Sequence, residues 1–235
     1  MSTLDFLITQ NYQFQNIFTK HILPKLYLEE LCCLLMVTKC LWNQRSNFNT
    51  LYLKLKNNNI TIEKLRNMPE EWIDRIHTLN FYWNKEIRNA DISILKNIRK
   101  LDLTCTGITD ISAFEGSQNL HTLILYLTDI EDILALGTCP NLCTLDLSST
   151  DVTDISVLGT CKNLHTLNLS DTQVKDISVL GTCKSLNSLS ICNTNITDIS
   201  ALGNCTNLRI IYLYDTNINN TQTLKGVTVR GPIEH

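Results

Sequence analysis

The sequence predicts an α/β solenoid, and three observations lead to this fold class. Within each repeated unit, apolar residues alternate at the fourth and sixth positions, as in a short strand with one buried face. Later in the unit an Asp-Ile pair, usually followed by Ser, is typical of a helix start. A unit this short must stack on its neighbours to bury its apolar face. The units repeat every 22 residues without insertion and open at Ile76, Ile98, Leu120, Leu142, Leu164, Leu186 and Leu208.

The first half of each unit predicts a strand followed by a tight bend. A representative unit, residues 164–185, reads LHTLNLSDTQVKDISVLGTCKS. Stacked strands of this kind form a parallel sheet. A threonine at the ninth position is expected to bond the backbone of the bend through its hydroxyl. These threonines are Thr106, Thr128, Thr150, Thr172, Thr194 and Thr216.

The second half of each unit predicts a short helical turn. Its aspartate carboxylates are expected to accept hydrogen bonds from free backbone N–H groups. Calcium binding is the alternative, but the motif lacks the alternating acids and glycines of a calcium loop. A leucine then fills the last inward position, and the glycine after it predicts a turn back. The aspartates are Asp110, Asp132, Asp154, Asp176 and Asp198, and the glycines are Gly137, Gly159, Gly181 and Gly203.

Together these positions give the string LxxLxLxxTx(I/V)xDIxxLGxCxx, which resembles the short 22-residue class of the leucine-rich repeat family. The match covers residues 76–224, with Thr at the position where the family usually has Asn. The resemblance implies a parallel β-sheet on the concave face and short turns or 3₁₀ segments on the convex face. We expect the solenoid over 76–226, an irregular first repeat or junction over 51–75 and a C-terminal tail over 227–235.

Residues 1–50 lack the repeat and predict a small helical segment. Apolar residues at helical spacing are interrupted by Pro24, which indicates at least two helices. Residues 22–42 resemble the F-box, although the usual Leu-Pro-x-Glu opening is missing and Trp42 lies one residue too far from Lys39. Alternatively, these helices cap the open end of the solenoid. The F-box resemblance implies that a Skp-type adaptor binds Leu28, Leu31, Leu34 and Val37.

Composition and motifs exclude several classes of function. A net charge of −3 and a pI near 5.9 give no electrostatic reason to expect nucleic-acid binding. No uncharged apolar run approaches the ~20 residues of a membrane span. The N-terminus lacks a secretion signal, so we expect a cytoplasmic protein. No phosphate loop, dinucleotide motif or nucleophile elbow appears, so we expect neither an enzyme nor a cofactor.

Cysteines and histidines recur at fixed positions of the repeat. Stacked thiols lie side by side rather than facing each other as a disulfide requires, so we expect reduced, buried cysteines. His121, Cys143 and His165 share one column, but duplication of a Leu-His-Thr-Leu unit explains them without a metal. We therefore expect no metal site. Ser117 precedes the cysteine column, which consists of Cys139, Cys161, Cys183 and Cys205.

Exposed positions of the predicted strands carry aromatic residues near both ends of the solenoid. Clustered exposed aromatic side chains are typical of protein-binding hot spots. A polar stretch separates the two groups and includes Asp146, Ser148, Asn168, Ser170, Asp171 and Ser190. Alternatively, the N-terminal helices fold back over the first group. The candidate partner-binding residues are Tyr82, Trp83, Ile124, Tyr126, Leu127, Tyr212 and Tyr214, with Ile210 beside the last two.

The sequence therefore predicts a non-enzymatic module that binds a protein target on its concave face. In its sharper form, the module resembles an F-box substrate receptor that presents this target to a cullin ubiquitin ligase. The alternative is a stand-alone scaffold or regulatory subunit with a helical cap. High identity between the repeats and abundant Asn, Ile and Lys are similar in style to proteins of protists and of the large DNA viruses that infect them.

Overall fold

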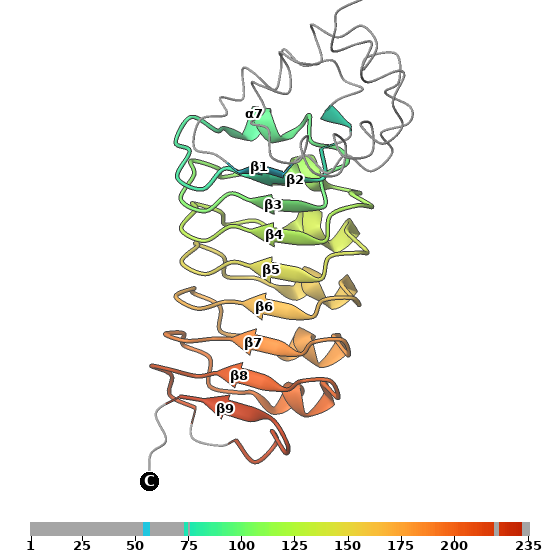
Figure 1. The fold of residues 1–235 in the computed structure, drawn as a ribbon. Coiled ribbons are helices and arrows are strands. Elements are labelled where there is room, and N and C mark those ends of the chain that lie inside the picture. Colours follow the sequence, from blue (N-terminus) through green and yellow to red (C-terminus); the bar gives the residue numbers. More distant parts are fainter. Residues whose placement is uncertain (1–53, 57–72, 75, 219–220, 232–235) are drawn as a thin grey trace, which may run out of the picture.

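The described part of the computed structural model comprises residues 54–56, 73–74, 76–218 and 221–231 (Figure 1). The predicted adaptor-binding residues, Leu28, Leu31, Leu34 and Val37, lie outside it. The sheet has nine parallel strands that follow each other in chain order. They are β1 Lys54–Lys56, β2 Thr78–Asn80, β3 Lys100–Asp102, β4 Thr122–Ile124, β5 Thr144–Asp146, β6 Thr166–Asn168, β7 Ser188–Ser190, β8 Ile210–Tyr212 and β9 Thr228–Arg230.

Each strand pairs with the same positions of the strand that follows it. In the middle of the stack, Leu145 pairs with Leu167, and between β2 and β8 the same offset of one repeat holds throughout. The central residue of the strand is buried and its two neighbours are half-buried in β5 and β6. The predicted strand register is therefore confirmed.

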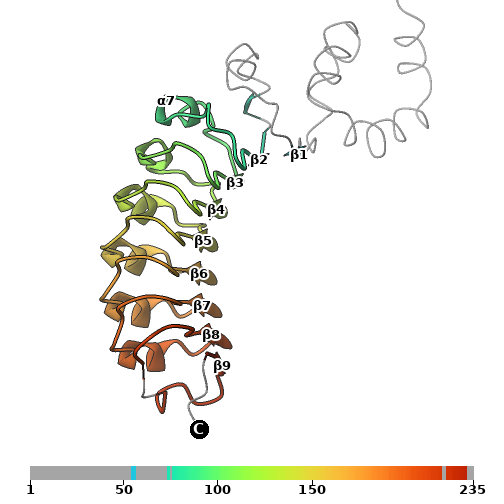
Figure 2. The ribbon, with the colours of Figure 1, turned by 90° about the vertical axis from the view of Figure 1, so that its left-hand side faces the viewer.

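Short helical segments form the other long face of the solenoid. Figure 2 shows the strands along the concave side and the helical segments along the convex side. The fold class predicted from the sequence is thus confirmed. No helix in the described ranges is long and apolar enough to cross a membrane. The segments are α7 Asn89–Ile92 and the 3₁₀ helices η4 Ser112–Phe114, η5 Leu134–Thr138, η6 Ser156–Thr160, η7 Ser178–Thr182 and η8 Ser200–Asn204.

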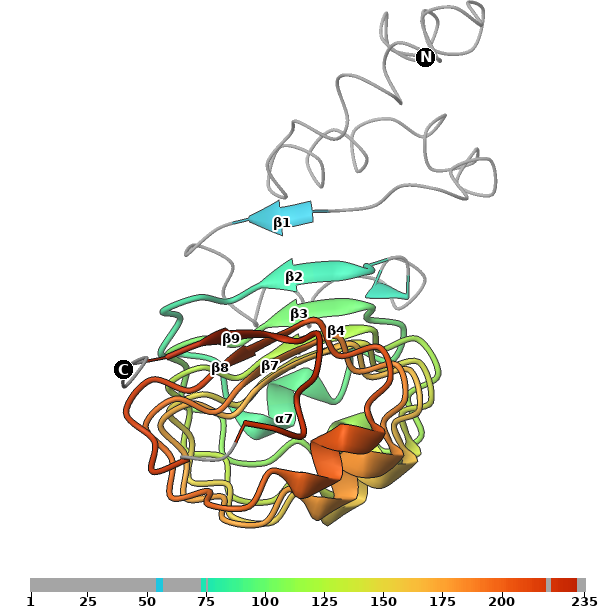
Figure 3. The same cartoon turned by 90° about the horizontal axis from the view of Figure 1, so that it is seen from below.

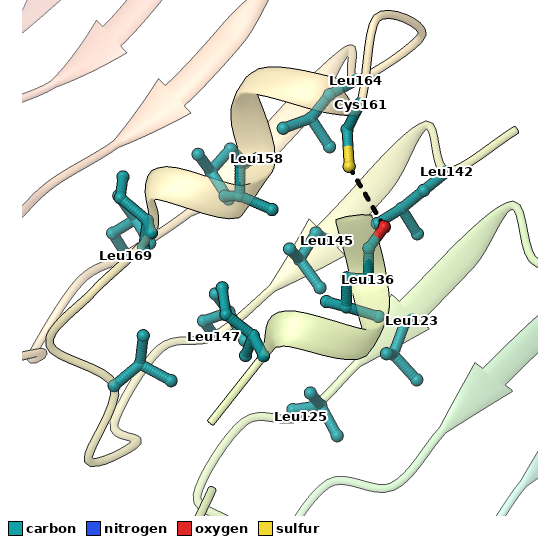
Figure 4. Packing of buried hydrophobic residues seen from close by; sticks show 14 of the residues in the cluster. Leu123, Leu125, Leu136, Leu142, Leu145, Leu147, Leu158, Cys161, Leu164 and Leu169 are labelled. Carbon is teal, nitrogen blue, oxygen red and sulfur yellow. Dashed lines mark hydrogen bonds between the residues drawn. The ribbon is translucent and has the colours of Figure 1, made fainter. Parts of the chain in front are cut away.

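Figure 3 shows the sheet and the helical segments on opposite sides of the solenoid. The buried residues between them form one hydrophobic core, and Figure 4 shows part of its packing. Leu145 and Leu147 point inward from one rung, and Leu167 and Leu169 do so from the next, all 1% exposed or less. Burying one such side chain stabilises the fold by roughly 1.5–3 kcal/mol. Because every rung repeats the pattern, each leucine packs on its counterparts in the adjacent rungs.

The capping aspartates and the bend threonines act as predicted on the backbone. The Ser156 and Ser178 amides each donate to the aspartate carboxylate two residues earlier, at 2.7 Å in both cases. The buried Thr172 hydroxyl donates to the Leu169 carbonyl at 2.6 Å. The threonine thus satisfies a carbonyl of the bend, rather than the bend amides.

The glycine column has a different role from the predicted turn. Gly137 lies within η5, and positive φ angles among the described glycines occur only at Gly116 and Gly226. A Cβ atom on Gly137 would overlap the Cγ2 atom of Val157 in the next rung. On Gly159 it would lie 2.6 Å from the corresponding valine carbon one rung later. These glycines let neighbouring 3₁₀ helices approach closely.

The two ends of the solenoid depart from the 22-residue period. Leu55 of β1 pairs with Leu79, an offset longer than one repeat. At the other end, β9 lies within the segment predicted as a tail, and Val229 pairs with Ile211. This last offset is shorter than one repeat, so β9 falls out of phase with the pattern that located the other strands.

The first complete rung carries the single described α-helical turn in place of a 3₁₀ helix. The Arg88 amide donates to the Asp91 carboxylate at 3.0 Å, which caps this turn. Asn89 links the rung to the next one, because its amide side chain accepts a hydrogen bond from the Thr109 N–H at 3.0 Å. Ile87 is fully buried. Ile87 and Asn89, which stand on either side of the position where later units have the aspartate, are thus still part of the stack.

Candidate protein-binding face

The largest exposed apolar side chains predicted on the sheet side are found there. Tyr82 and Trp83 are 46% and 57% exposed, and Tyr126 and Leu127 are 39% and 47% exposed. Tyr214, at the other end of the sheet, is 48% exposed. The remaining predicted members, Ile124, Ile210 and Tyr212, are half-buried.

The first cluster consists of Tyr82, Trp83, Tyr126 and Leu127, and it spans three rungs. The first pair follows β2 and the second follows β4, so strand spacing of ~4.8 Å puts the pairs roughly 10 Å apart. The rings of Tyr82 and Trp83 meet edge to face, with their centroids 6.1 Å apart. The Lys85 ammonium lies 6.0 Å from the centre of the Trp83 ring. These apolar groups therefore sit beside a positive charge.

A left-handed backbone column underlies this cluster. The eighth residue of every unit has a positive φ, between 50° and 62°. Bulky residues rarely adopt this conformation, which costs roughly 1–2 kcal/mol, whereas Asn and Asp adopt it more readily. Sequence reasoning missed this column, although Asp and Asn at three of its positions were a usable signal. The column is Trp83, Cys105, Leu127, Ser149, Asp171, Asn193 and Asp215.

The polar middle of the face is partly committed to the fold. The Asp146 carboxylate accepts a hydrogen bond from the Ser148 amide at 2.9 Å and one from its hydroxyl at 2.5 Å. Ser148 is consequently buried, and its predicted exposure is wrong. Asn168 accepts from the Ser170 amide in the same way, at 3.1 Å. These fifth-position side chains close the bend after the strand.

The second cluster, Ile210, Tyr212 and Tyr214, lies next to the last strand. Tyr212 pairs in register with Arg230 of β9. All three residues of β9 are exposed. An incoming partner would therefore meet an arginine beside the tyrosines at this end of the sheet.

Buried thiols form a ladder that explains the cysteine column. The Cys161 Sγ donates to the Leu136 carbonyl of the preceding rung at 3.4 Å (Figure 4), and the Cys139 Sγ donates to the Phe114 carbonyl at 3.2 Å. Burial raises the pKa of the Cys139 thiol to about 11. All seven cysteines in the described ranges are free, as predicted. These thiols are structural groups, because burial opposes formation of the reactive thiolate.

The histidine column lies at the edge of the sheet where the strands begin. The Nδ1 atoms of His121 and His165 lie 3.2 and 3.3 Å from the hydroxyls of Thr122 and Thr166. Cys143 lies between the two histidines along the column, on the intervening rung. Among the described residues, no group of three His, Cys, Asp or Glu side chains is arranged to hold a metal ion.

Comparison with known proteins identifies the type of repeat. Residues 140–182 and 184–226 match the family model described as leucine rich repeats (2 copies). No curated protein gives a significant match to the sequence. The repeats within these two ranges thus match leucine-rich repeats, in agreement with the sequence resemblance.

Solved structures show the same fold. Internalin C2 from Listeria monocytogenes is similar, with a TM-score of 0.56 and 24% identity over 70% of this chain and 84% of that one. A leucine-rich repeat protein from Leptospira interrogans has a TM-score of 0.59 and 18% identity, over 69% of this chain and 51% of that one. The plant peptide hormone receptor RGFR1, solved in complex with RGF2, has a TM-score of 0.54 and 17% identity, over 67% of this chain and 33% of that one. At these identities the likeness extends to the fold alone.

Proposed function

We propose that this chain is a non-enzymatic protein-binding module whose partner docks on the concave sheet face. The observation that carries the proposal is the group of exposed apolar side chains on that face, centred on the first cluster. Exposed aromatic groups of this kind dominate the energetics of protein interfaces. Leucine-rich repeat proteins generally mediate protein–protein interaction, and their fold is typically a non-enzymatic scaffold.

The energetics favour recognition over chance exposure. Trp83 and Leu127 hold the left-handed conformation while about half of each side chain faces water. Neither the strain nor the exposure stabilises the isolated chain. Covering one half-exposed aromatic side chain removes on the order of 100 Å² of apolar surface from water, which stabilises a complex by about 2–3 kcal/mol.

The proposal is tested by comparing variants of the intact chain in affinity capture. Tyr82→Ala combined with Tyr126→Ala should lose the partner. Leu134→Ala is the matched control, because Leu134 is also a large exposed apolar residue, at 65%, but lies on the convex η5. A protein retained by the wild type and the control but lost by the double variant is then purified and measured by calorimetry. Equal retention by all three would contradict the proposed face.

The F-box resemblance supports a more specific form of this proposal. In that form, residues 14–42 bind a Skp-type adaptor while the repeats hold a target for a cullin ubiquitin ligase. Leu34→Asp with Val37→Asp should abolish binding of the purified adaptor, and Tyr82→Ala with Tyr126→Ala should leave it intact. If the wild-type chain does not bind the adaptor at micromolar concentration, the F-box form is wrong.

The alternative to the F-box form is a scaffold or regulatory subunit whose N-terminal helices serve as a cap. The same adaptor measurement separates the two forms, because a cap needs no adaptor. Cytoplasmic location is part of either form and is supported by the buried free thiols of the solenoid. Alkylation of the chain under denaturing conditions at lysis, without reductant, should modify these cysteines, and mass spectrometry counts the modified residues.

A further inference from the structure

A second surface, separate from the apolar clusters, is a polar groove along the edge where the strands begin. Its volume is about 820 Å³. The second residues of five successive rungs line it, together with amide and hydroxyl side chains from the turns that precede the strands. These second-position residues are His77, Arg99, His121, Cys143 and His165.

Three basic side chains in the groove have unused hydrogen-bonding atoms. His121 and His165 each engage a threonine hydroxyl through Nδ1, and neither Nε2 has a partner within the described ranges. When Nδ1 accepts the threonine proton, Nε2–H remains free to donate into the groove. Arg99 is exposed, and its guanidinium makes no hydrogen bond or ion pair with any described residue. All three side chains are therefore available to a ligand.

The groove has no negative charge to balance these groups. The chain as a whole contains 23 Asp and Glu against 20 Lys and Arg, yet none of the described lining residues is acidic. The other polar lining atoms hold the rim together: Asn141 donates to the Gln118 carbonyl at 2.8 Å and Asn163 to the Pro140 carbonyl at 2.9 Å. The lining therefore suits an anion.

We propose that this groove binds an acidic segment of a partner protein, whose carboxylates pair with Arg99 and with the Nε2 atoms of His121 and His165. Five rungs at ~4.8 Å span roughly 19 Å, which an extended segment of about six residues covers. Arginine supplies a bidentate match for a carboxylate, and the imidazole Nε2–H groups add further hydrogen bonds.

The test uses the full-length chain and fluorescein-labelled hexaglutamate, with fluorescence anisotropy as the readout at low salt. Arg99→Glu should weaken binding by about tenfold or more, because it removes a charge-assisted pair and adds repulsion. The matched control is Arg209→Glu, which changes the same repeat position in a rung that does not line the groove. It should shift the affinity by no more than about twofold. Arg99→Gln serves as a second variant that avoids a reversed charge.

A double histidine variant tests the other two contacts. His121→Ala with His165→Ala removes both Nε2 donors and should weaken hexaglutamate binding by about threefold or more, because the carboxylates lose two hydrogen bonds. Circular dichroism of this variant should stay unchanged.

Four results of the binding assays would overturn the proposal. They are failure of hexaglutamate to bind, equal binding of labelled hexalysine, equal losses from Arg99→Glu and Arg209→Glu, and an unchanged affinity after the double histidine change. Sedimentation at low salt tests whether a second copy of this chain occupies the groove instead. If the wild type self-associates and Arg99→Glu does not, the groove binds a second copy of this chain, and the proposed partner is wrong. None of these outcomes depends on the apolar clusters.

Discussion

Replacing Gly137 with alanine should destabilise the solenoid, whereas the same replacement at Gly203 should stabilise it. Both glycines lie in 3₁₀ helices without a positive φ, so alanine suits the backbone at either site. The space around them differs. A Cβ atom on Gly137 overlaps Val157 Cγ2, but on Gly203 its nearest neighbours are atoms of Thr223, 3.9 Å away, an ordinary contact.

The magnitudes follow from two opposing effects. Alanine in place of glycine restricts the unfolded chain and should stabilise a helical position by roughly 0.5–1 kcal/mol. Overpacking costs about 1–3 kcal/mol. The first effect is common to Gly137→Ala and Gly203→Ala, so the difference between the variants isolates the steric cost. For a chain of this size, ~1 kcal/mol corresponds to ~2–4 °C in Tm, so the two Tm values should differ by several degrees.

Urea unfolding followed by circular dichroism measures the free energies, and a double-mutant cycle identifies the cause. Val157→Ala removes the carbon that the new methyl group meets, so Gly137→Ala should cost less in the Val157→Ala background than in the wild type. If Gly137→Ala is as stable as Gly203→Ala, or if the Val157 change gives no relief, close packing of 3₁₀ helices is not the reason for the glycine column.

Four further perturbations test other parts of the structure. Thr172→Val removes the hydroxyl that donates to a bend carbonyl at 2.6 Å and should cost about 1–3 kcal/mol in urea unfolding, whereas Thr166→Val on the strand face should cost little. Ser117→Ala deletes a buried hydroxyl that has no partner among the described residues, so the Tm should rise, and a fall would contradict this account. Burial raises the pKa of the Cys139 thiol from 9.0 to about 11. The contribution of the buried, protonated thiol to the stability of the fold is therefore complete below pH 9.0 and is lost as the pH rises through about 11. The stability advantage of the wild type over Cys139→Ala should therefore shrink across that pH range. A constant difference would show that burial does not raise the pKa of this thiol. Leu127→Asn should relieve backbone strain and raise stability by about 1 kcal/mol while weakening capture of the partner; an unchanged or lower stability would count against the strain.

The period of the sequence was sufficient to predict the stack itself. Because no residue is inserted between Ile76 and Leu208, position within the unit determines which residues pair, and Leu145 meets Leu167 as expected. The same logic located the exposed aromatic residues, since strand positions alternate between core and solvent. Periodicity could not locate β9, whose offset from β8 is shorter than one unit.

Other features depend on contacts between rungs, which a single unit does not contain. Gly137, Gly159 and Gly181 have an ordinary backbone, and a side chain there would meet a valine or a carbonyl of the next rung. Ser148, in contrast, is buried by a contact within its own unit, because its amide and its hydroxyl both donate to the Asp146 carboxylate. The groove of histidines requires Arg99 and Cys143 to fall into the same column, which becomes apparent when the rungs are stacked.

The left-handed column links the fold to the binding face. Every unit must place one residue in this conformation to leave the strand, and Asp171, Asn193 and Asp215 do so with the side chains best suited to it. Selection for folding alone would favour Asn, Asp or Gly at the first and third rungs as well. Trp83 and Leu127 stand there instead, strained and half exposed. Strain retained at exposed apolar residues is characteristic of functional sites, where stability is exchanged for binding. The two rungs that depart furthest from the preferred chemistry of the bend are therefore the rungs where we propose that partner contact is concentrated.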